Sequence, residues 1–331
     1  MKTWRRPFLW IILLVVALVS LLPIVLNSAT MREEIFLILM LTVLASSVNI
    51  IMGYTGYVNF GHIVFFGLGG YIAFYLMQNW HAHLLVAAIA GGVVATAFAF
   101  LLGMPILRLR GAYFALATIG ITEAMRAFFT NFDPFGGSIG MFFNFSVYDA
   151  YGGAANALWF AYDVLVVVAL LTIALSFFVK KSKFGLGLMA IREDQDAAQV
   201  LGLDTTRYKV LAFTASAFFP AIAGALFFFK NGIIEPGIAF DLLLSIEVLV
   251  MVMLGGFGTV AGPVIGAAIY ELIRSTLITA PPLDLGIVTI NFSNLHLFIT
   301  GLLLLLTVLF ITTGVVGLLR RRVPVFGGSL E

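Results

Sequence analysis

Five ionisable side chains lie inside stretches that are otherwise apolar. Glu123 and Arg126 are three residues apart, Glu271 and Arg274 repeat that spacing, and Glu247 has no evident partner in its own stretch. Helical residues three apart share a face, so each pair can neutralise its own charges. Because ionisable groups inside apolar spans are costly, all five are candidates for gating or a transport path. The simpler interpretation is that each Glu–Arg couple forms an intramembrane ion pair and that Glu247 contacts a partner across the bundle.

Two stretches combine an apolar background with residues that break helices. GYTGYVNFG covers residues 53–61, and GGFGTVAGP covers residues 255–263. Glycine weakens a helix interior by up to about 1 kcal/mol relative to alanine. Backbone groups freed inside a membrane must be buried in protein or face water, so both stretches predict hinges or path linings that avoid lipid. The candidates of this kind are Gly53, Gly56, Asn59, Gly61, Gly255, Gly256 and Gly258, with Glu247.

The composition decides which class of protein must position these residues. The 331 residues are 62% hydrophobic and 10% charged, whereas soluble domains have about 25% charged residues. The absence of cysteine excludes disulfides and thiol chemistry, and four histidines give no convincing metal site. We therefore expect an all-α, polytopic integral membrane helix bundle that forms one domain over residues 1–331, with interrupted helices and no metal.

Apolar windows long enough to cross a bilayer predict about ten transmembrane spans. The first is interpreted as a retained helix, because its apolar run is too long for an ordinary signal peptide. The two glycine-rich stretches suggest an internal repeat, either parallel or inverted. The predicted spans are 8–26, 34–52, 57–78, 84–104, 112–130, 158–179, 209–229, 241–255, 259–280 and 294–318.

The basic residues test the number of spans. Fourteen of the eighteen lysines and arginines fall in four clusters, and ten spans put all four clusters on one side. The positive-inside rule then predicts that both termini are cytoplasmic. The clusters are Lys2, Arg5 and Arg6; Arg108 and Arg110; Lys180, Lys181, Lys183, Arg192, Arg207 and Lys209; and Arg320, Arg321 and Arg322.

The segment from residue 180 to 209 is the only long polar stretch on that side. Its apolar residues fall on one side of a helix, among charged residues. Gly202 is expected to end a helix, and Asp204 or Thr205 is expected to cap the next one. We expect short amphipathic helices projecting from the membrane. The pattern alone leaves open whether they lie on lipid headgroups or dock a cytoplasmic partner.

Four stretches, in order, are similar to a known family. They are GYTGYVNFGHIVFFGLGGY, RGAYFALATIGITEAMR, FGLGLMAIREDQDAAQVLGLDTTRYKVLAFTASAFFPAIAGALF and SIEVLVMVMLGGFGTVAGPVIGA. They resemble LivM-type permease subunits of branched-chain amino acid ABC importers. The resemblance extends from about residue 35 to 318. It implies a bacterial inner-membrane transport subunit that is not itself an enzyme.

The resemblance also implies partners and a docking site. Such a permease pairs with a related LivH-type permease, two cytoplasmic ATPases that hold ATP and Mg, and a periplasmic or lipid-anchored binding protein. No nucleic acid is implied. The family's E-A-A-x-x-x-G docking motif corresponds to D-A-A-x-x-x-G here, within a coupling loop at 183–207. The implied coupling residues are Arg192, Asp196, Ala197, Ala198 and Gly202.

Other functions remain open at this stage. A urea or short-chain amide importer of the same class fits the same residues. An ion-coupled secondary transporter would need cation-coordinating carboxylates within its spans and no docking loop. The chain has no G-x-x-x-x-G-K-[ST] phosphate-binding motif, so energy must come from a partner or an ion gradient.

Overall fold

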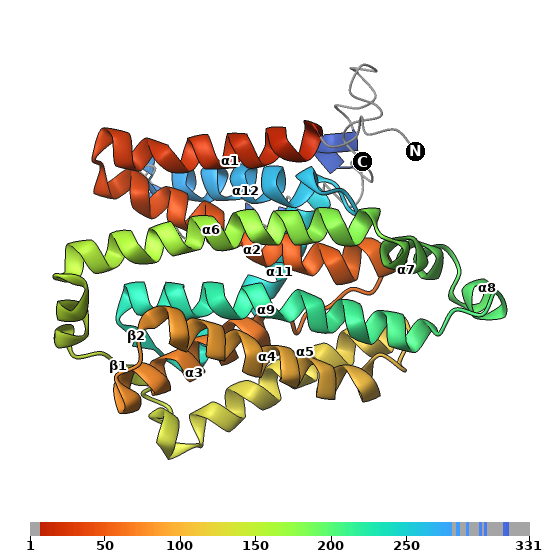
Figure 1. The fold of residues 1–331 in the computed structure, drawn as a ribbon, viewed down its shortest axis with the longest axis horizontal. Coiled ribbons are helices and arrows are strands. Elements are labelled where there is room, and N and C mark those ends of the chain that lie inside the picture. Colours follow the sequence, from red (N-terminus) through yellow and green to blue (C-terminus); the bar gives the residue numbers. More distant parts are fainter. Residues whose placement is uncertain are drawn as a thin grey trace.

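The computed structural model describes residues 7–279 and the short segments 283–284, 289–290, 298–299, 301–302 and 314–317. Its long helices run alongside one another, with α7 and α8 at one end of the bundle and strands β1 and β2 at the other (Figure 1). Within residues 7–279 the α-helices are α1 (Pro7–Leu26), α2 (Ala29–Thr55), α3 (Ile63–Trp80), α4 (Leu84–Ile106), α5 (Ala112–Thr130), α6 (Ala154–Lys181), α7 (Lys183–Glu193), α8 (Gln195–Val200), α9 (Thr205–Asn231), α10 (Pro236–Ala239), α11 (Leu242–Gly255) and α12 (Ala261–Thr279).

The remaining elements are short. The 3₁₀ turns η2 (Asp133–Phe135) and η3 (Phe145–Tyr151) flank β1 (Met141–Phe142) in the segment between α5 and α6. Strand β1 pairs antiparallel with β2 (Ile233–Ile234), so that Met141 lies opposite Ile234. Strands β3 (Leu283–Asp284) and β4 (Thr289–Ile290) form a second antiparallel pair.

The helices confirm the predicted all-α membrane fold. Nine of the ten predicted spans coincide with α1 to α6, α9, α11 and α12, and the tenth, 294–318, lies mostly outside the described residues. Within the described part of the chain, seven helical segments are long and apolar enough to cross a membrane, and α3 and α5 are not among them. The chain is therefore a multi-pass membrane protein.

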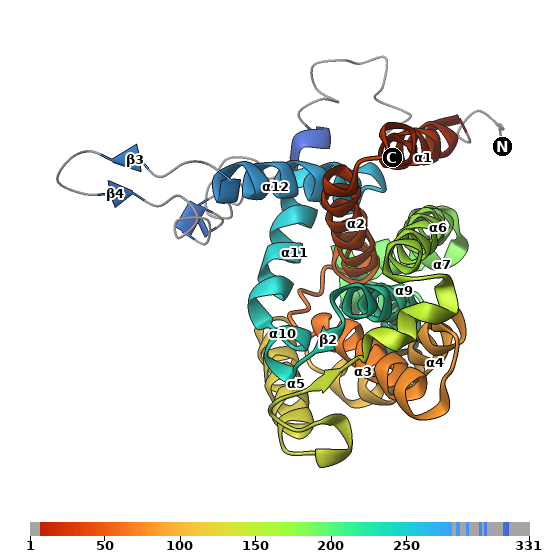
Figure 2. The ribbon, with the colours of Figure 1, turned by 90° about the vertical axis from the view of Figure 1, so that its left-hand side faces the viewer.

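Helix α9 lies at the centre of the bundle. In the view along the long axis it is surrounded by α2, α3, α4 and α6, whereas α1 lies at the periphery (Figure 2). Glycines allow the central helices to approach closely. A Cβ on Gly224 of α9 would lie 2.0 Å from the carbonyl oxygen of Phe66, and one on Gly69 of α3 would lie 2.2 Å from that of Ala221. Such close contacts between backbones replace the hydrophobic driving force that helices lack in lipid.

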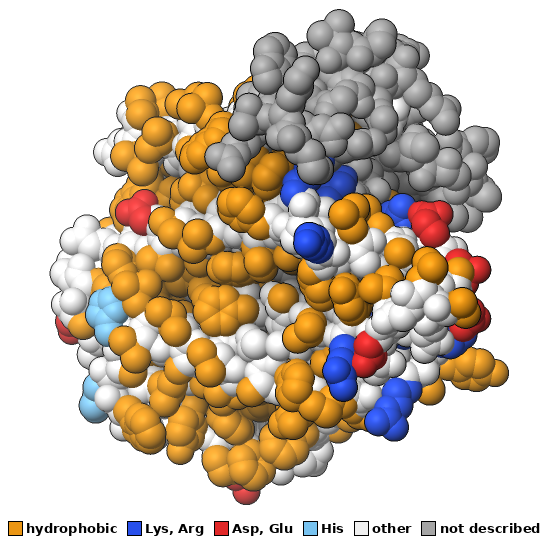
Figure 3. Space-filling model, turned by 45° about the vertical axis from the view of Figure 1, so that its right-hand side comes forward, with side chains coloured by type: hydrophobic (Ala, Val, Ile, Leu, Met, Phe, Trp, Pro, Cys, Tyr) orange, Lys and Arg blue, Asp and Glu red, His pale blue; other side chains and the backbone are white. Residues whose placement is uncertain are grey.

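The surface separates apolar from charged side chains. Hydrophobic side chains cover much of the middle of the visible face, and basic and acidic side chains gather towards the α7–α8 end (Figure 3). Helix α1 is the extreme case, because only 17% of its span is buried within this chain. This distribution matches an apolar belt in lipid with one charged end in water.

Candidate functional site

The first helix break lies between α2 and α3. Helix α2 ends at Thr55, Gly56 takes a left-handed conformation with φ of 79°, and α3 begins at Ile63. The sequence predicted a break from Gly53 onwards, but Gly53 is still helical, so the break begins three residues later. The break lies towards the α7–α8 end of the bundle. Asn59 and Gly61 are buried, whereas Gly56 is exposed.

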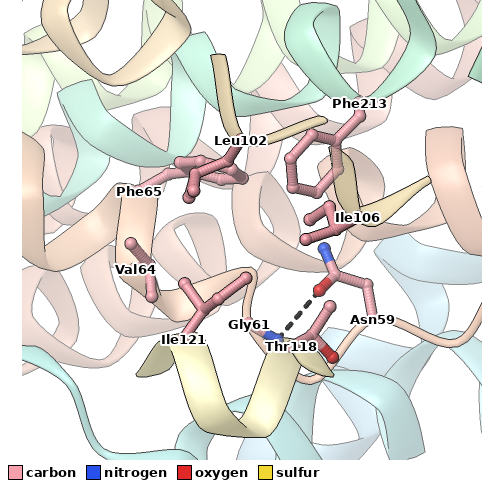
Figure 4. Close-up of a pocket in the computed structure, with 9 residues that line it drawn as sticks. All are labelled: Asn59, Gly61, Val64, Phe65, Leu102, Ile106, Thr118, Ile121 and Phe213. Carbon is pink, nitrogen blue, oxygen red and sulfur yellow. Dashed lines mark hydrogen bonds between the residues drawn. The ribbon is translucent and has the colours of Figure 1, made fainter. Parts of the chain in front are cut away.

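Side chains satisfy the backbone groups that this break frees. The Asn59 side chain accepts a hydrogen bond from the backbone N–H of Gly61 at 2.9 Å (Figure 4). The hydroxyl of Thr118, on α5, accepts one from the N–H of Phe60 at 3.2 Å. The adjoining cavity has a volume of only about 10 Å³, which is room for about one water molecule. The part of the break from Asn59 to Gly61 is therefore held internally, as an interruption within a membrane protein must be.

The second break connects α11 and α12. Gly258 has φ of 71°, a conformation that favours glycine. The helices on either side touch through glycine, because a Cβ on Gly255 would lie 1.8 Å from the carbonyl oxygen of Gly262. The hydroxyl of Thr259 donates to the carbonyl of Gly256 at 2.7 Å and stabilises the turn.

The last turns of α2, just before the first break, meet the second break, although about 200 residues separate them in the sequence. The side chain of Asn49 donates to the carbonyl of Thr259 at 2.9 Å and accepts from the N–H of Gly258 at 3.0 Å. A Cβ on Gly53 would lie 2.1 Å from the Asn49 side-chain oxygen and 3.0 Å from the Gly258 nitrogen. We call this contact, formed by Asn49, Gly53 and Gly258 with Lys180 and Arg192, the glycine junction.

Two basic side chains complete the glycine junction. Arg192, on α7, donates to the carbonyl of Gly53 at 3.0 Å, and its guanidinium lies 5.7 Å from the centre of the Phe257 ring. Lys180, near the end of α6, donates to the carbonyl of Gly258 at 2.8 Å. One residue of the predicted coupling loop therefore contacts both helix breaks directly.

The predicted coupling loop forms the two short helices expected from its pattern. Ser182 begins α7 by accepting from the N–H of Gly185, and Asp194 begins α8 by accepting from the N–H groups of Asp196 and Ala197. Gly202 has φ of 88° after α8 has ended. Asp204 then caps α9, which confirms the predicted stop and cap.

Two more contacts tie α8 to the rest of the bundle. The Tyr57 hydroxyl, in the first break, donates to the side chain of Gln195 at 2.6 Å and accepts from the Lys209 ammonium at 2.9 Å. Asp196 forms an ion pair with Arg110, in the connection between α4 and α5, at 2.8 Å. The α7–α8 segment thus contacts three connections between spans.

The rest of α8 faces outward. Ala198 is buried, but Ala197 is exposed, and the side chains of Val200 and Leu201 are 88% and 81% exposed. The end of α8 is therefore not covered by the described part of the chain.

The two Glu–Arg pairs exist as predicted but differ in burial. Glu123 and Arg126 approach to 2.8 Å, and both side chains are about half exposed. Glu271 and Arg274 approach to 3.2 Å, and Glu271 is nearly buried. Glu247 is also buried, on α11. Within the described residues, no three acidic or histidine side chains come together in a way that could hold a metal.

The structure adds residues that sequence reasoning missed. Lys180 and Lys209 entered that reasoning only as markers of topology, and Tyr57 had no assigned role. The sequence feature that could have identified them is a basic or hydroxyl side chain at the edge of a span beside a helix break, because the free carbonyl groups there need hydrogen-bond donors.

Comparison with known proteins identifies the family. Residues 31–308 match the family model described as branched-chain amino acid transport system / permease component. The LivM permease proteins of the high-affinity branched-chain amino acid transport systems of Salmonella typhimurium and Escherichia coli K12 are each 32% identical over 258 residues. The LivH permease protein of E. coli K12 is 29% identical over 154 residues, which cover 46% of each chain. No solved structure matches the chain.

The family assignment depends on how much of each chain the alignments cover. The alignment with LivM covers 71% of this chain and 60% of the relative, so the chain spans about three-fifths of the length of these relatives. The family model covers most of the chain, from within α2 to beyond α12. The chain therefore belongs to the family of branched-chain amino acid transport system permease components.

Proposed function

We propose that the chain is the membrane-spanning permease subunit of an ATP-driven importer for branched-chain and related hydrophobic amino acids. The family match over residues 31–308 carries this proposal. The chain would receive its substrate from a binding protein and release it into the cytoplasm by alternating access. ATP and Mg would be held by two partner ATPases, and a LivH-type permease would complete the membrane part.

The α7–α8 segment supports a role in coupling. Its exposed end, with Ala197, Val200 and Leu201, would seat on an ATPase. Its inner side, through Arg192, bonds to the glycine junction. A displacement of α7 would therefore act on the α2–α3 and α11–α12 connections together. Rigid helices joined at such breaks can tilt relative to one another without disrupting their own hydrogen bonds.

The charge distribution supports an orientation. Arg110, which pairs with Asp196 of α8, lies at the α7–α8 end with Lys180 and Arg192, and this end would face the cytoplasm of a bacterial inner membrane. Both termini would lie on that side. The β1–β2 end would then face the binding protein.

Purification tests the assembly. The chain is purified with its native partners in mild detergent, and ATPases and a second permease should accompany it. Gly202→Asp should lose the ATPases, because a φ of 88° disfavours aspartate and the added charge lies beside the docking helix. Retention of ATPases and uptake by Gly202→Asp would contradict the docking proposal.

Uptake tests the substrate. Cells that lack the chain and any redundant importer are compared with wild type for labelled leucine, isoleucine, valine, phenylalanine and urea. The proposal predicts loss of amino-acid uptake. Loss of urea uptake alone would assign the chain to an amide importer, and uptake driven by an ion gradient without ATP would assign it to a secondary transporter.

A further inference from the structure

Helix α5 carries its ion pair on an open face. Tyr113, Leu116 and Glu123 follow one another at helical spacing, and the first two are 74% and 64% exposed. Gly120 lies on the same face, and nothing lies within 4 Å of the position of a Cβ there. The face is therefore uncovered by the described part of the chain.

Glu123 and Arg126 line a pocket at the β1–β2 end of this face. Its volume is about 390 Å³, within the usual range for small-molecule sites. The pocket lies between α5, the start of α10 and the segment that follows α5. The lining is mostly polar or small: Glu123, Arg126, Ala127, Thr130, Asn131, Ser138, Pro236 and Gly237.

Hydrocarbon would be a costly cover for this pair. Glu123 lies seven residues from the end of α5, about 10 Å along the helix axis at 1.5 Å per residue. Charged side chains at membrane depth face a bundle interior, a partner or a water-filled cavity. Because the side chains are about half exposed in this chain, the pocket faces either water or another subunit.

The chemistry of the pocket fits one class of cargo. A free α-amino acid carries an ammonium and a carboxylate close together. A glutamate can accept from the ammonium, and an arginine can donate two parallel hydrogen bonds to the carboxylate. Exposed ion pairs contribute little to stability, so the 2.8 Å bond between Glu123 and Arg126 can open for cargo and re-form after its release.

We propose that Glu123 and Arg126 form an entrance site that binds the ammonium and carboxylate groups of the transported amino acid. The inference rests on the proposed function of amino-acid import. In this inference the pair contacts the cargo and does not serve only in packing. In the second Glu–Arg pair, by contrast, the Glu271 side chain is nearly buried.

Neutralising variants separate recognition from packing. The complete importer, with its binding protein, is reconstituted in vesicles, and the initial rate of ATP-dependent leucine uptake is measured. Glu123→Gln, Arg126→Gln and the double variant should each lower this rate about tenfold or more, since each removes a charged hydrogen bond to the cargo. Asn79→Ala, an exposed residue outside the pocket, is the control and should retain the wild-type rate.

The double variant decides between the two roles. If the pair only neutralised itself, removing both charges would restore uptake to about the wild-type rate, as expected for coupled residues. That result, or unchanged uptake in all three variants, would overturn the inference while leaving the proposed function intact. A wild-type importer that moves no amino acid would overturn the proposed function itself.

Cysteine labelling provides a second measurement if a charge variant fails to assemble. The chain contains no cysteine, so an introduced one is the only thiol in it. Ala127→Cys should react with a membrane-impermeant thiol reagent, and excess leucine should slow the reaction. Leu18→Cys, on the exposed face of α1, should stay unreactive in lipid. Absence of reaction at Ala127→Cys in an active importer would contradict a water-accessible site.

Discussion

The two ends of the bundle use charged side chains in opposite ways. At the α7–α8 end, Arg192 and Lys180 are committed to backbone carbonyls of the glycine junction. At the β1–β2 end, Glu123 and Arg126 bond mainly to one another on an open face. Charges that satisfy freed backbone groups hold elements in place, whereas an exposed pair can exchange partners. The first end is built to transmit displacement and the second to meet a ligand.

The largest effect should come from closing the space at the glycine junction. Gly53→Ala places a Cβ 2.1 Å from the Asn49 side-chain oxygen. Overpacking typically costs about 1–3 kcal/mol, so the thermal midpoint of the purified complex should fall by several degrees. Gly120→Ala is the matched control, because its Cβ meets nothing and alanine favours the helix. Equal losses in both variants would show that the junction has no special packing.

A smaller loss is expected at the first helix break. Asn59→Ala leaves the buried N–H of Gly61 without its 2.9 Å acceptor. An unsatisfied buried group costs about 1–3 kcal/mol, and measured values within membranes fall towards the low end. The thermal midpoint of the complex reports this loss. As a control, Asn156→Ala removes an exposed side-chain hydrogen bond to the carbonyl of Gly152 and should leave the midpoint unchanged. If Asn59→Ala had the same midpoint as this control, a water molecule would be accepting the hydrogen bond from Gly61 in place of Asn59.

The open pocket should contribute little to stability. Removing both charges of the Glu123–Arg126 pair should change the free energy of unfolding by less than about 1 kcal/mol, because the pair is about half exposed. The same melting experiment tests this expectation. A large loss in the double variant would mean that another subunit buries the pair, and the contrast between the two ends would fail.

An exposed contact at the α7–α8 end should behave like the pocket. Asp196→Asn weakens the ion pair with Arg110, whose two side chains are 73% and 53% exposed. It should change the free energy of unfolding by no more than about 0.5 kcal/mol, and the thermal midpoint reports this change. A loss as large as that of Gly53→Ala would show that this exposed pair stabilises the α7–α8 end as strongly as the glycine junction does.

Much of the fold could be predicted because it is local. Apolar run lengths located nine described helices, and the apolar side of the polar stretch 180–209, with its stop and next cap, predicted the short helices α7 and α8. The start of the first break was placed too early because glycine has two uses. Gly53 stays helical, and its missing side chain makes room for Asn49 and Gly258 rather than breaking the helix.

The meeting of distant residues could not be predicted in the same way. Nothing in local periodicity indicates that Asn49 bonds to Gly258, or that Arg192 reaches Gly53. The identical spacing of the two Glu–Arg pairs likewise conceals their different burial. Spacing along a helix fixes which residues share a face, but neighbouring helices decide whether that face is covered.

Coupling through Arg192 is the central claim, and the amount of leucine transported per ATP hydrolysed tests it most directly. Arg192→Gln, in the reconstituted importer, removes the charged donor to the Gly53 carbonyl. The account predicts that the ATPases remain bound and hydrolyse ATP while leucine transported per ATP falls about tenfold. Arg108→Gln, an exposed basic residue at the same end, should leave the ratio unchanged. An unchanged ratio in Arg192→Gln would contradict transmission through the glycine junction.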